Sequence, residues 1–350
     1  MSVLSLSLID CPDVQKDIEN SFNDRPSRLE DVNITRFLVS QTNTNRVLKT
    51  DIGPGDGKIR DAVLTFQPRY SEADVDSAID RETCTTTNTA GQDQFTCQVD
   101  LEVGVSIEER IRLKDIARIC ESNREYIGRR LNAMLDAAMR KMETDVTEQV
   151  VLCTGAFAEN DTNGVIADIK TVTTLLPVAN GGQLSYDAIS EIQFSAMQAM
   201  YAGNSYVFGS NLISKHFKMV AAACCADHGV DIDQFFGQSG IVFLDSYRVP
   251  TALSDTQGFL SIDAGSVQLP YVNLNEGESN TVQTPDYVEG VIFEPRTGLP
   301  FDFTFKHDCG ILYMKVALAY NVCCLPDDLY TLDDRLSGVT GVQQFTVTNT

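Results

Sequence analysis

A long series of apolar residues spaced three and four positions apart predicts one amphipathic helix over residues 122–153. Ser122 and Glu125 mark its start, because they have the S-x-x-E spacing of a capping box. At 1.5 Å per residue the helix would be about 45 Å long, whereas the average globular helix has about 11–12 residues. A helix of that length needs a long surface to cover it. The predicted buried face consists of Ile127, Leu131, Met134, Leu135, Ala138, Met139, Met142, Val146 and Val150.

The other side of this helix is predicted to be polar. Taken by itself, the pattern is that of a long core helix, and it does not require a neighbouring subunit. The predicted polar surface consists of Arg129, Arg130, Asp136, Arg140, Lys141, Glu143 and Asp145.

Two alternating segments upstream predict paired strands on either side of a long polar excursion. Over residues 95–103 apolar and polar side chains alternate, which is the period of a strand with one buried face. A weaker pattern covers residues 59–66 and ends before Pro68. If these strands pair, residues 69–94 form an extended loop, because a loop this long in a compact domain is either functional or disordered. A flexible surface insertion is the alternative.

The charge of the chain argues against one large class of partners. Lys and Arg total 27 against 49 Asp and Glu, which gives a net charge of -22. The phosphate backbone repels such a chain, so we expect no sequence-specific binding of nucleic acid. The same charge would suit the inner wall of a container whose polyanionic contents must not adhere.

The sequence predicts no membrane contact. No apolar run approaches the roughly 18 residues that a membrane-spanning helix needs. The opening residues lack the basic start of a secretory signal, so we expect synthesis in a cytoplasm.

The ten cysteines predict buried thiols rather than a disulfide framework or a metal site. The chain has no C-x-x-C motif, and the two cysteine pairs are adjacent residues, Cys224-Cys225 and Cys323-Cys324. Together with His216 and His228, the first pair does not match a standard zinc spacing. Cys84 and Cys97 flank the distal half of the excursion, and we consider a bond between them after exposure to an oxidant.

The second half of the chain predicts helices on a sheet, followed by consecutive strands. Short apolar runs at residues 206–209 and 241–244 are typical of buried strands, and helices are predicted from Ser185 and from residue 210 or 211. Apolar residues alternate before and after a turn at residues 308–310, which predicts an antiparallel hairpin. This order predicts an α+β fold.

A search for catalytic motifs finds none. Residues 53–58 resemble a phosphate-binding loop only superficially, since Ile52 replaces its first glycine and Ile59 its Ser or Thr. The three histidines, the third being His307, fall into no standard catalytic spacing. We therefore predict no catalytic, cofactor-binding or metal residues and no enzymatic activity.

Two local segments and the order of the elements carry a resemblance to a known family. Residues 106–120 resemble a short helix leading into a spine helix, and residues 258–268 resemble late central-domain strands. A polar N-terminal segment, a two-stranded extended loop, a long spine helix, a mixed α/β segment and late strands follow in the order of tailed-phage major capsid proteins with the Hong Kong 97-like fold. The resemblance covers most of the chain.

The resemblance implies a division of the chain into five parts. The late strands of the last part return to the peripheral and axial domains and precede a C-terminal tail. The parts are an N-terminal arm lying along a neighbour (1–57), an extended loop (58–104), a peripheral domain with the spine helix (105–182), an axial domain (183–265) and the late strands (266–350).

By the same resemblance, the protein self-assembles as hexamers and pentamers into an icosahedral shell around double-stranded DNA, without a cofactor. It would be made in the host cytoplasm and end in the virion. Its partners would be a separate scaffolding protein, a portal and auxiliary cement proteins. Residues 69–94 contain no lysine for the lysine–asparagine cross-link of some family members. The residues expected to contact neighbouring subunits are Arg69, Arg81, Thr85, Asn88, Gln92, Arg129, Arg130 and Glu143.

Two other functions stay open at this point. A prokaryotic encapsulin-like nanocompartment shell resembles the same fold, and genes for a terminase and a portal beside this gene would separate the two. A cytosolic α+β enzyme with an unrecognised site would instead be a stable monomer or small oligomer.

Overall fold

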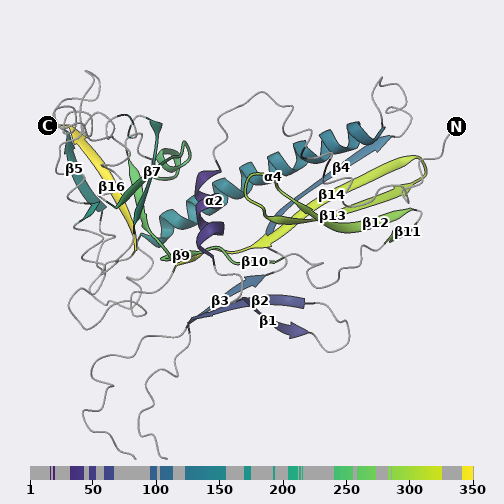
Figure 1. Ribbon diagram of the computed structural model, residues 1–350, viewed down its shortest axis with the longest axis horizontal. Helices are drawn as coiled ribbons and strands as arrows, with labels where there is room; N and C mark the ends of the chain where they lie inside the picture. The colour runs from purple at the N-terminus through teal and green to yellow at the C-terminus, as the bar shows by residue number, and fades with distance from the viewer. Residues whose placement is uncertain are drawn as a thin grey trace, which may run out of the picture.

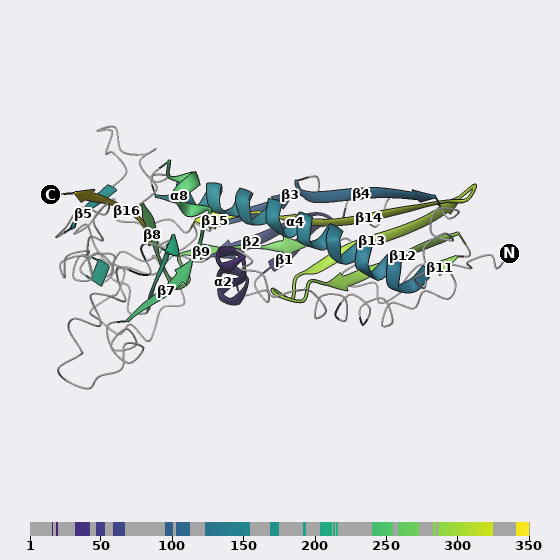
Figure 2. The ribbon, with the colours of Figure 1, turned by 90° about the horizontal axis from the view of Figure 1, so that it is seen from above.

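The structure is a computed structural model that describes residues 16, 19, 32–42, 47–52, 59–66, 95–100, 103–112, 123–154, 169–174, 192–193, 204–211, 213, 215, 240–254, 258–272, 283–284, 286–324 and 341–349. One long helix, α4 (Asn123–Cys153), lies along a sheet of long strands (Figure 1). A second sheet lies at one end of this helix, and a third lies to one side of the body. Viewed from above, the body is elongated along α4 (Figure 2).

The predicted long helix is confirmed. α4 has 31 residues, and its sequence is rich in Ala, Leu, Met, Arg and Glu, which have high helix propensity. All nine residues of the predicted apolar face are buried. On the polar side Arg140 and Lys141 are exposed and form ion pairs four residues along the helix with Asp136 and Asp145. None of the helices in the described ranges has both the length and the apolar character to cross a bilayer.

The sheet beneath α4 has six strands, and every pairing in it is antiparallel. The predicted hairpin is confirmed within it as β13 and β14, joined by Cys309 and Gly310. Both turn residues have positive φ, +47° and +80°, as a type I′ turn in a two-residue hairpin requires. The strands are β10 (Tyr271–Val272), β14 (Ile311–Tyr320), β13 (Pro300–Asp308), β12 (Tyr287–Phe293) and β11 (Gln283–Thr284) in that order, with β4 (Gly104–Arg112) also paired to β14.

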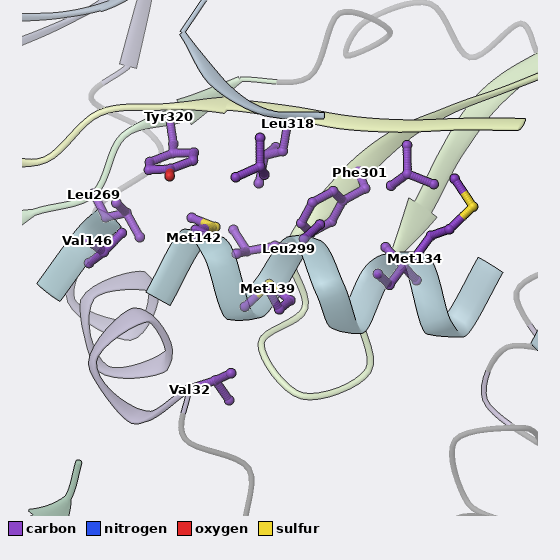
Figure 3. Close-up of a cluster of buried hydrophobic side chains, with 14 of the residues drawn as sticks. Val32, Met134, Met139, Met142, Val146, Leu269, Leu299, Phe301, Leu318 and Tyr320 are labelled. Atoms are coloured by element: carbon purple, nitrogen blue, oxygen red, sulfur yellow. The ribbon is translucent and has the colours of Figure 1, made fainter. Parts of the chain in front are cut away.

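The main core fills the space between α4 and this six-stranded sheet. Figure 3 shows Phe301, Leu318 and Tyr320 on the sheet side, facing Met139 and Met142 of the helix. Burying a large apolar side chain contributes about 1.5–3 kcal/mol relative to its exposure, so these contacts dominate the attachment of α4.

β4 corrects one sequence interpretation. Residues 106–120 were expected to form a short helix, but residues 104–112 are a strand that pairs with β14 along its whole length, and residues 113–120 lie outside the described ranges. Val105 and Ile111 are buried while Ser106 and Arg110 are exposed, which is the alternation of a strand. A Cβ atom at Gly104 would collide with the backbone oxygen of Leu318, so the close approach of the two strands needs glycine there.

A three-stranded antiparallel sheet lies beside the body. Its strands are β1 (Val47–Ile52), β2 (Ile59–Phe66) and β3 (Phe95–Asp100). The predicted pairing of residues 59–66 with residues 95–100 is confirmed, but the sheet has a third strand that the sequence analysis missed. Val103 was expected on the buried face and is 56% exposed, because the chain turns after Asp100 to enter β4. The excursion at residues 69–94 lies outside the described ranges.

A five-stranded mixed sheet lies at the far end of α4. Its order is β5 (Ile169–Thr174), β16 (Val342–Asn349), β8 (Phe259–Asp263), β6 (Ser205–Gly209) and β7 (Ile241–Asp245). The β5–β16 and β6–β7 pairs are parallel, and the two pairs that involve β8 are antiparallel. The strands predicted near residues 206, 241 and 258–268 are confirmed, the last as β8 and β9 (Val267–Gln268).

Part of the expected N-terminal arm belongs to the body. Residues 33–41 form a helix, α2 (Asn33–Gln41), with Ile34 and Leu38 fully buried in the same core as α4. For these residues the expectation of an arm lying along a neighbour is wrong, because their apolar side chains pack on their own chain.

Four cysteines depart from the expectation of buried thiols. Cys97 pairs with Cys323 and Cys153 with Cys324, with Cα–Cα distances of 6.1 and 5.8 Å. These separations lie within the range of natural disulfides. The partner considered for Cys97 was Cys84, which lies outside the described ranges, and the structure places Cys323 there instead. Sequence spacing could not reveal these pairs, since 226 and 171 residues separate their members.

We expect Phe303→Ala to lower the free energy of unfolding by about 3–5 kcal/mol, because Phe303 is fully buried in the main core. Urea denaturation followed by circular dichroism measures this loss. Lys306→Ala is the control, since Lys306 is exposed on the same strand and should change stability by no more than about 0.5 kcal/mol. Equal losses in the two variants would contradict the placement of β13 against α4.

Candidate functional site

Glu143 is a carboxylate in the buried stripe of α4. Its two oxygens accept hydrogen bonds from the backbone N–H groups of Ile34 and Thr35, each at 2.9 Å. These amides belong to the first turn of α2, whose N-cap residue Val32 provides no side-chain cap. A helix start carries free N–H groups and partial positive charge, so Glu143 supplies from another helix the cap that α2 lacks.

The predictions made for Glu143 are therefore corrected. The residue was placed on the polar surface and among the contacts to neighbouring subunits, but its side chain has no exposed surface. A signal for burial was present in the sequence, because Glu143 lies four residues after Met139 and three before Val146, within the apolar stripe.

Two further hydrogen bonds fix α2 to other elements. The Asn33 side-chain amide donates to the backbone oxygen of Asp245 at the end of β7, at 2.5 Å. At the other end of α2, the Thr42 hydroxyl accepts from the backbone N–H of Leu269 at 2.8 Å. α2 thus joins the spine helix to the five-stranded sheet and to the segment after β9.

Polar contacts also join α4 to the six-stranded sheet along its length. Arg130 forms an ion pair with Glu109 of β4, and its Nε donates to Glu109 at 3.1 Å. Tyr320 of β14 donates to Asp145 at 3.4 Å. Burial, with a smaller contribution from the nearby Asp145 carboxylate, raises the pKa of Tyr320 and keeps its hydroxyl protonated.

A buried carboxylate orders the turn between β12 and β13, and an arginine holds the turn on α4. Glu294, 1% exposed, accepts hydrogen bonds from the backbone N–H groups of Arg296 and Thr297 at 2.9 and 2.8 Å. Arg296 pairs with Glu294 and reaches Asp136 of α4 at 3.2 Å. The network satisfies the turn's amides and sets the turn on the middle of the helix.

Of the other residues predicted to contact neighbours, the structure describes two. Arg129 is exposed on α4, with its guanidinium 5.9 Å from the centre of the Tyr126 ring. Arg130 is 43% exposed, although it also pairs with Glu109 of the same chain. The remaining residues, Arg69, Arg81, Thr85, Asn88 and Gln92, lie outside the described ranges, so their predicted contacts stay a prediction.

A depression of about 210 Å³ lies among the outward-facing side chains of the six-stranded sheet. This is below the roughly 300–1,000 Å³ of small-molecule sites. Four of its five charged side chains have partners: Lys315 pairs with Glu108 at 3.2 Å, Glu109 pairs with Arg130, and the Arg110 guanidinium lies 5.4 Å from the centre of the Tyr313 ring. The depression has the chemistry of a solvated sheet face rather than of a reaction centre.

Burial raises the pKa of the Asp263 carboxyl from 3.8 to about 6. It lies in β8 with 4% of its surface exposed. The Ser205 hydroxyl donates to it at 2.7 Å, which opposes the effect of burial without cancelling it. The pair links neighbouring strands inside the five-stranded sheet, so its role is structural.

Neither a metal site nor a catalytic cluster emerges from these groups. Across the described ranges, no three His, Cys, Asp or Glu side chains converge in a way that could hold a metal ion. His307 Nδ1 lies 3.5 Å from Asp286, at the end of β13. What the arrangement does is hold helices and sheets in a fixed relation, by ion pairs, side-chain hydrogen bonds and a carboxylate on backbone amides.

The sequence matches no protein-family model and no curated protein. Among solved structures, the chain is similar to the capsid asymmetric unit of cyanophage A-1(L), with a TM-score of 0.50 and 11% identity over 92% of this chain and 94% of that one. The chain is also similar to the capsid of Myoviridae phage XM1, with a TM-score of 0.46 and 10% identity over 99% of both chains. A third similar structure is the capsid of cyanophage P-SCSP1u, with a TM-score of 0.45 and 10% identity over 93% of this chain and 91% of that one. We base the fold on the first of the three: it is α+β and Hong Kong 97-like.

We expect Glu143→Gln to destabilise the chain by about 1–3 kcal/mol, because it removes the charge and one of two acceptors from buried amides. Hydrogen exchange of residues 33–41 measures the effect where it should be largest. Glu148→Gln is the matched control, since Glu148 is exposed on the same helix. If both variants exchange at the wild-type rate in α2, Glu143 does not cap that helix.

The buried carboxyl of Asp263 should make the free energy of unfolding depend on pH. Its folded pKa of about 6 exceeds the ordinary value of 3.8, so the folded state binds the proton more tightly and stability falls as pH rises between these values. Asp263→Asn keeps an acceptor for the Ser205 hydroxyl, so its free energy of unfolding should match that of wild type near pH 3.8. Above a pH of about 6 the variant should be more stable than wild type by about 3 kcal/mol. Denaturation midpoints across the range measure this, and a constant difference between the two proteins would contradict it.

Proposed function

We propose that this chain is the major capsid protein of a tailed bacteriophage, which assembles as hexamers and pentamers into an icosahedral shell around double-stranded DNA. One observation carries the proposal: the likeness to the cyanophage A-1(L) capsid extends over nearly the whole of both chains. A protein of this kind works by its shape, and the described side chains serve packing and capping.

The charge of the chain supports the same function. Because its net charge is -22, the protein repels DNA, so packaged DNA would move along the inner wall without adhering. The chain would be made in the host cytoplasm and end in the virion. A separate scaffolding protein, a portal and cement proteins belong to the proposal as partners.

The domain boundaries that the resemblance implies are kept as part of this proposal, except where strand pairing or packing crosses them. Residues 33–41 are assigned to the body instead of the arm, and residues 47–52, which pair with β2, are assigned to the extended loop. The remaining contact residues are proposed to meet neighbouring subunits: Arg69, Arg81, Thr85, Asn88, Gln92, Arg129 and Arg130. An encapsulin-like shell shares the fold, and no described residue favours it over a viral capsid.

Electron microscopy and sedimentation of the full-length protein test the proposal. We expect closed shells, or hexamers and pentamers, as the ionic strength is raised and the repulsion between acidic subunits is screened. A protein that stays monomeric under all conditions, with or without its scaffolding partner, would refute a shell function.

Arg129→Glu should reduce assembly while leaving the unfolding free energy within about 0.5 kcal/mol of wild type. Arg140→Glu is the comparison, because Arg140 is an exposed arginine of the same helix that is not a proposed contact. Equal assembly by the two variants would remove Arg129 from the interface without touching the shell proposal.

A further inference from the structure

Two adjacent cysteines in one short strand form disulfides with two different parts of the molecule. β15 (Cys323–Cys324) pairs with β9, which lies between the five-stranded and the six-stranded sheets (Figure 1). Successive side chains of a strand point to opposite faces, so the two sulfurs diverge. Cys323 reaches Cys97 in the three-stranded sheet, and Cys324 reaches Cys153 in the last turn of α4.

The three-stranded sheet has a small packed contact with the body in the part where its side chains are described. Val99 of β3 forms a buried cluster with only Val272 and Ala319, and this cluster is separate from the main core. The Asn321 side-chain amide lies 3.9 Å from the sulfur of Cys97. Three small apolar side chains bury little area, so among the described side chains of β3 the Cys97–Cys323 bond is the main tie to the body beyond the chain itself.

The end of α4 is held in a different way. Val146, Val150 and Cys153 are all buried in the main core, and Thr144 accepts a hydrogen bond from Arg248 near the start of α8 (Val249–Ala252). This end of the helix would stay in place without a covalent link. The two disulfides therefore differ in what they control, although they share one strand.

We propose that the Cys97–Cys323 disulfide is a redox-controlled latch that fixes the three-stranded sheet to the body, whereas Cys153–Cys324 reinforces a contact already held by packing. The inference concerns the single chain and does not depend on whether that chain builds a shell. Reduction leaves β3 held to the body by packing alone, so β3 opens more often, and oxidation holds it closed.

The latch closes by exchange with a low-molecular-weight disulfide. The thiolate of one cysteine attacks a sulfur of that disulfide, and one small thiol leaves. The second protein thiolate then attacks the mixed disulfide, forming the S–S bond and releasing the second small thiol. The protein loses two electrons and two protons, and the small disulfide gains both. A reducing cytosol keeps the latch open, and an oxidising medium closes it.

Peptide mapping tests the pairing. Trypsin cleavage after Lys or Arg gives peptides 82–110, 142–170 and 316–335, which contain Cys97, Cys153 and the adjacent pair. In protein treated with oxidised glutathione and digested without reductant, we expect one species of all three peptides. In Cys153→Ala/Cys324→Ala, peptides 82–110 and 316–335 should stay joined. Free alkylated Cys97, or a bond within peptide 82–110 to Cys84, would overturn the latch.

Hydrogen exchange of residues 95–100 tests what the latch controls. In wild type, reduction should speed exchange there by about tenfold or more, because β3 loses its cross-link to β15 and opens more often. Cys153→Ala/Cys324→Ala should respond to reduction in the same way. Cys97→Ala/Cys323→Ala should exchange fast in either state. Equal exchange in oxidised and reduced wild type would overturn the proposal even if the variants fail to fold.

Discussion

The burial of one face of α4 is the constraint on which the rest of this structure depends. A helix of 31 residues with a continuous apolar stripe cannot stay in water, and here the six-stranded sheet covers it. The two surfaces run lengthwise together, which gives the body its elongated form. The strands, the β12–β13 turn and α2 all take their positions from this one contact.

Buried carboxylates accept hydrogen bonds from backbone N–H groups that apolar packing cannot satisfy. Glu143 caps α2, and Glu294 satisfies the amides of the turn between β12 and β13. Both are buried, and both are acceptors for backbone N–H groups instead of partners for a substrate. Part of the negative charge of this acidic chain therefore lies inside the protein, where it stabilises a helix start and a turn.

Periodic patterns decided how much of the fold could be predicted from the sequence. α4 and the β13–β14 hairpin repeat their pattern over many residues, so their positions were predicted correctly. β4 was missed because Glu109 interrupts its apolar face, and β1 because Lys49 and Asp51 weaken its alternation. The role of Glu143 and the disulfides depends on partners more than 100 residues away, which no local pattern records. The loop contacts are still predictions.

The position of β16 has a consequence for the order in which the molecule is made. This strand lies between β5 and β8, so residues 342–349 are inserted into a sheet whose other strands were translated much earlier. Until they emerge from the ribosome, β5 lacks its one neighbour among the described strands, and β8 presents an open edge. Unfinished nascent chains therefore lack a completed sheet at one end, and a ribosome that stalls late would leave that edge for chaperones to guard.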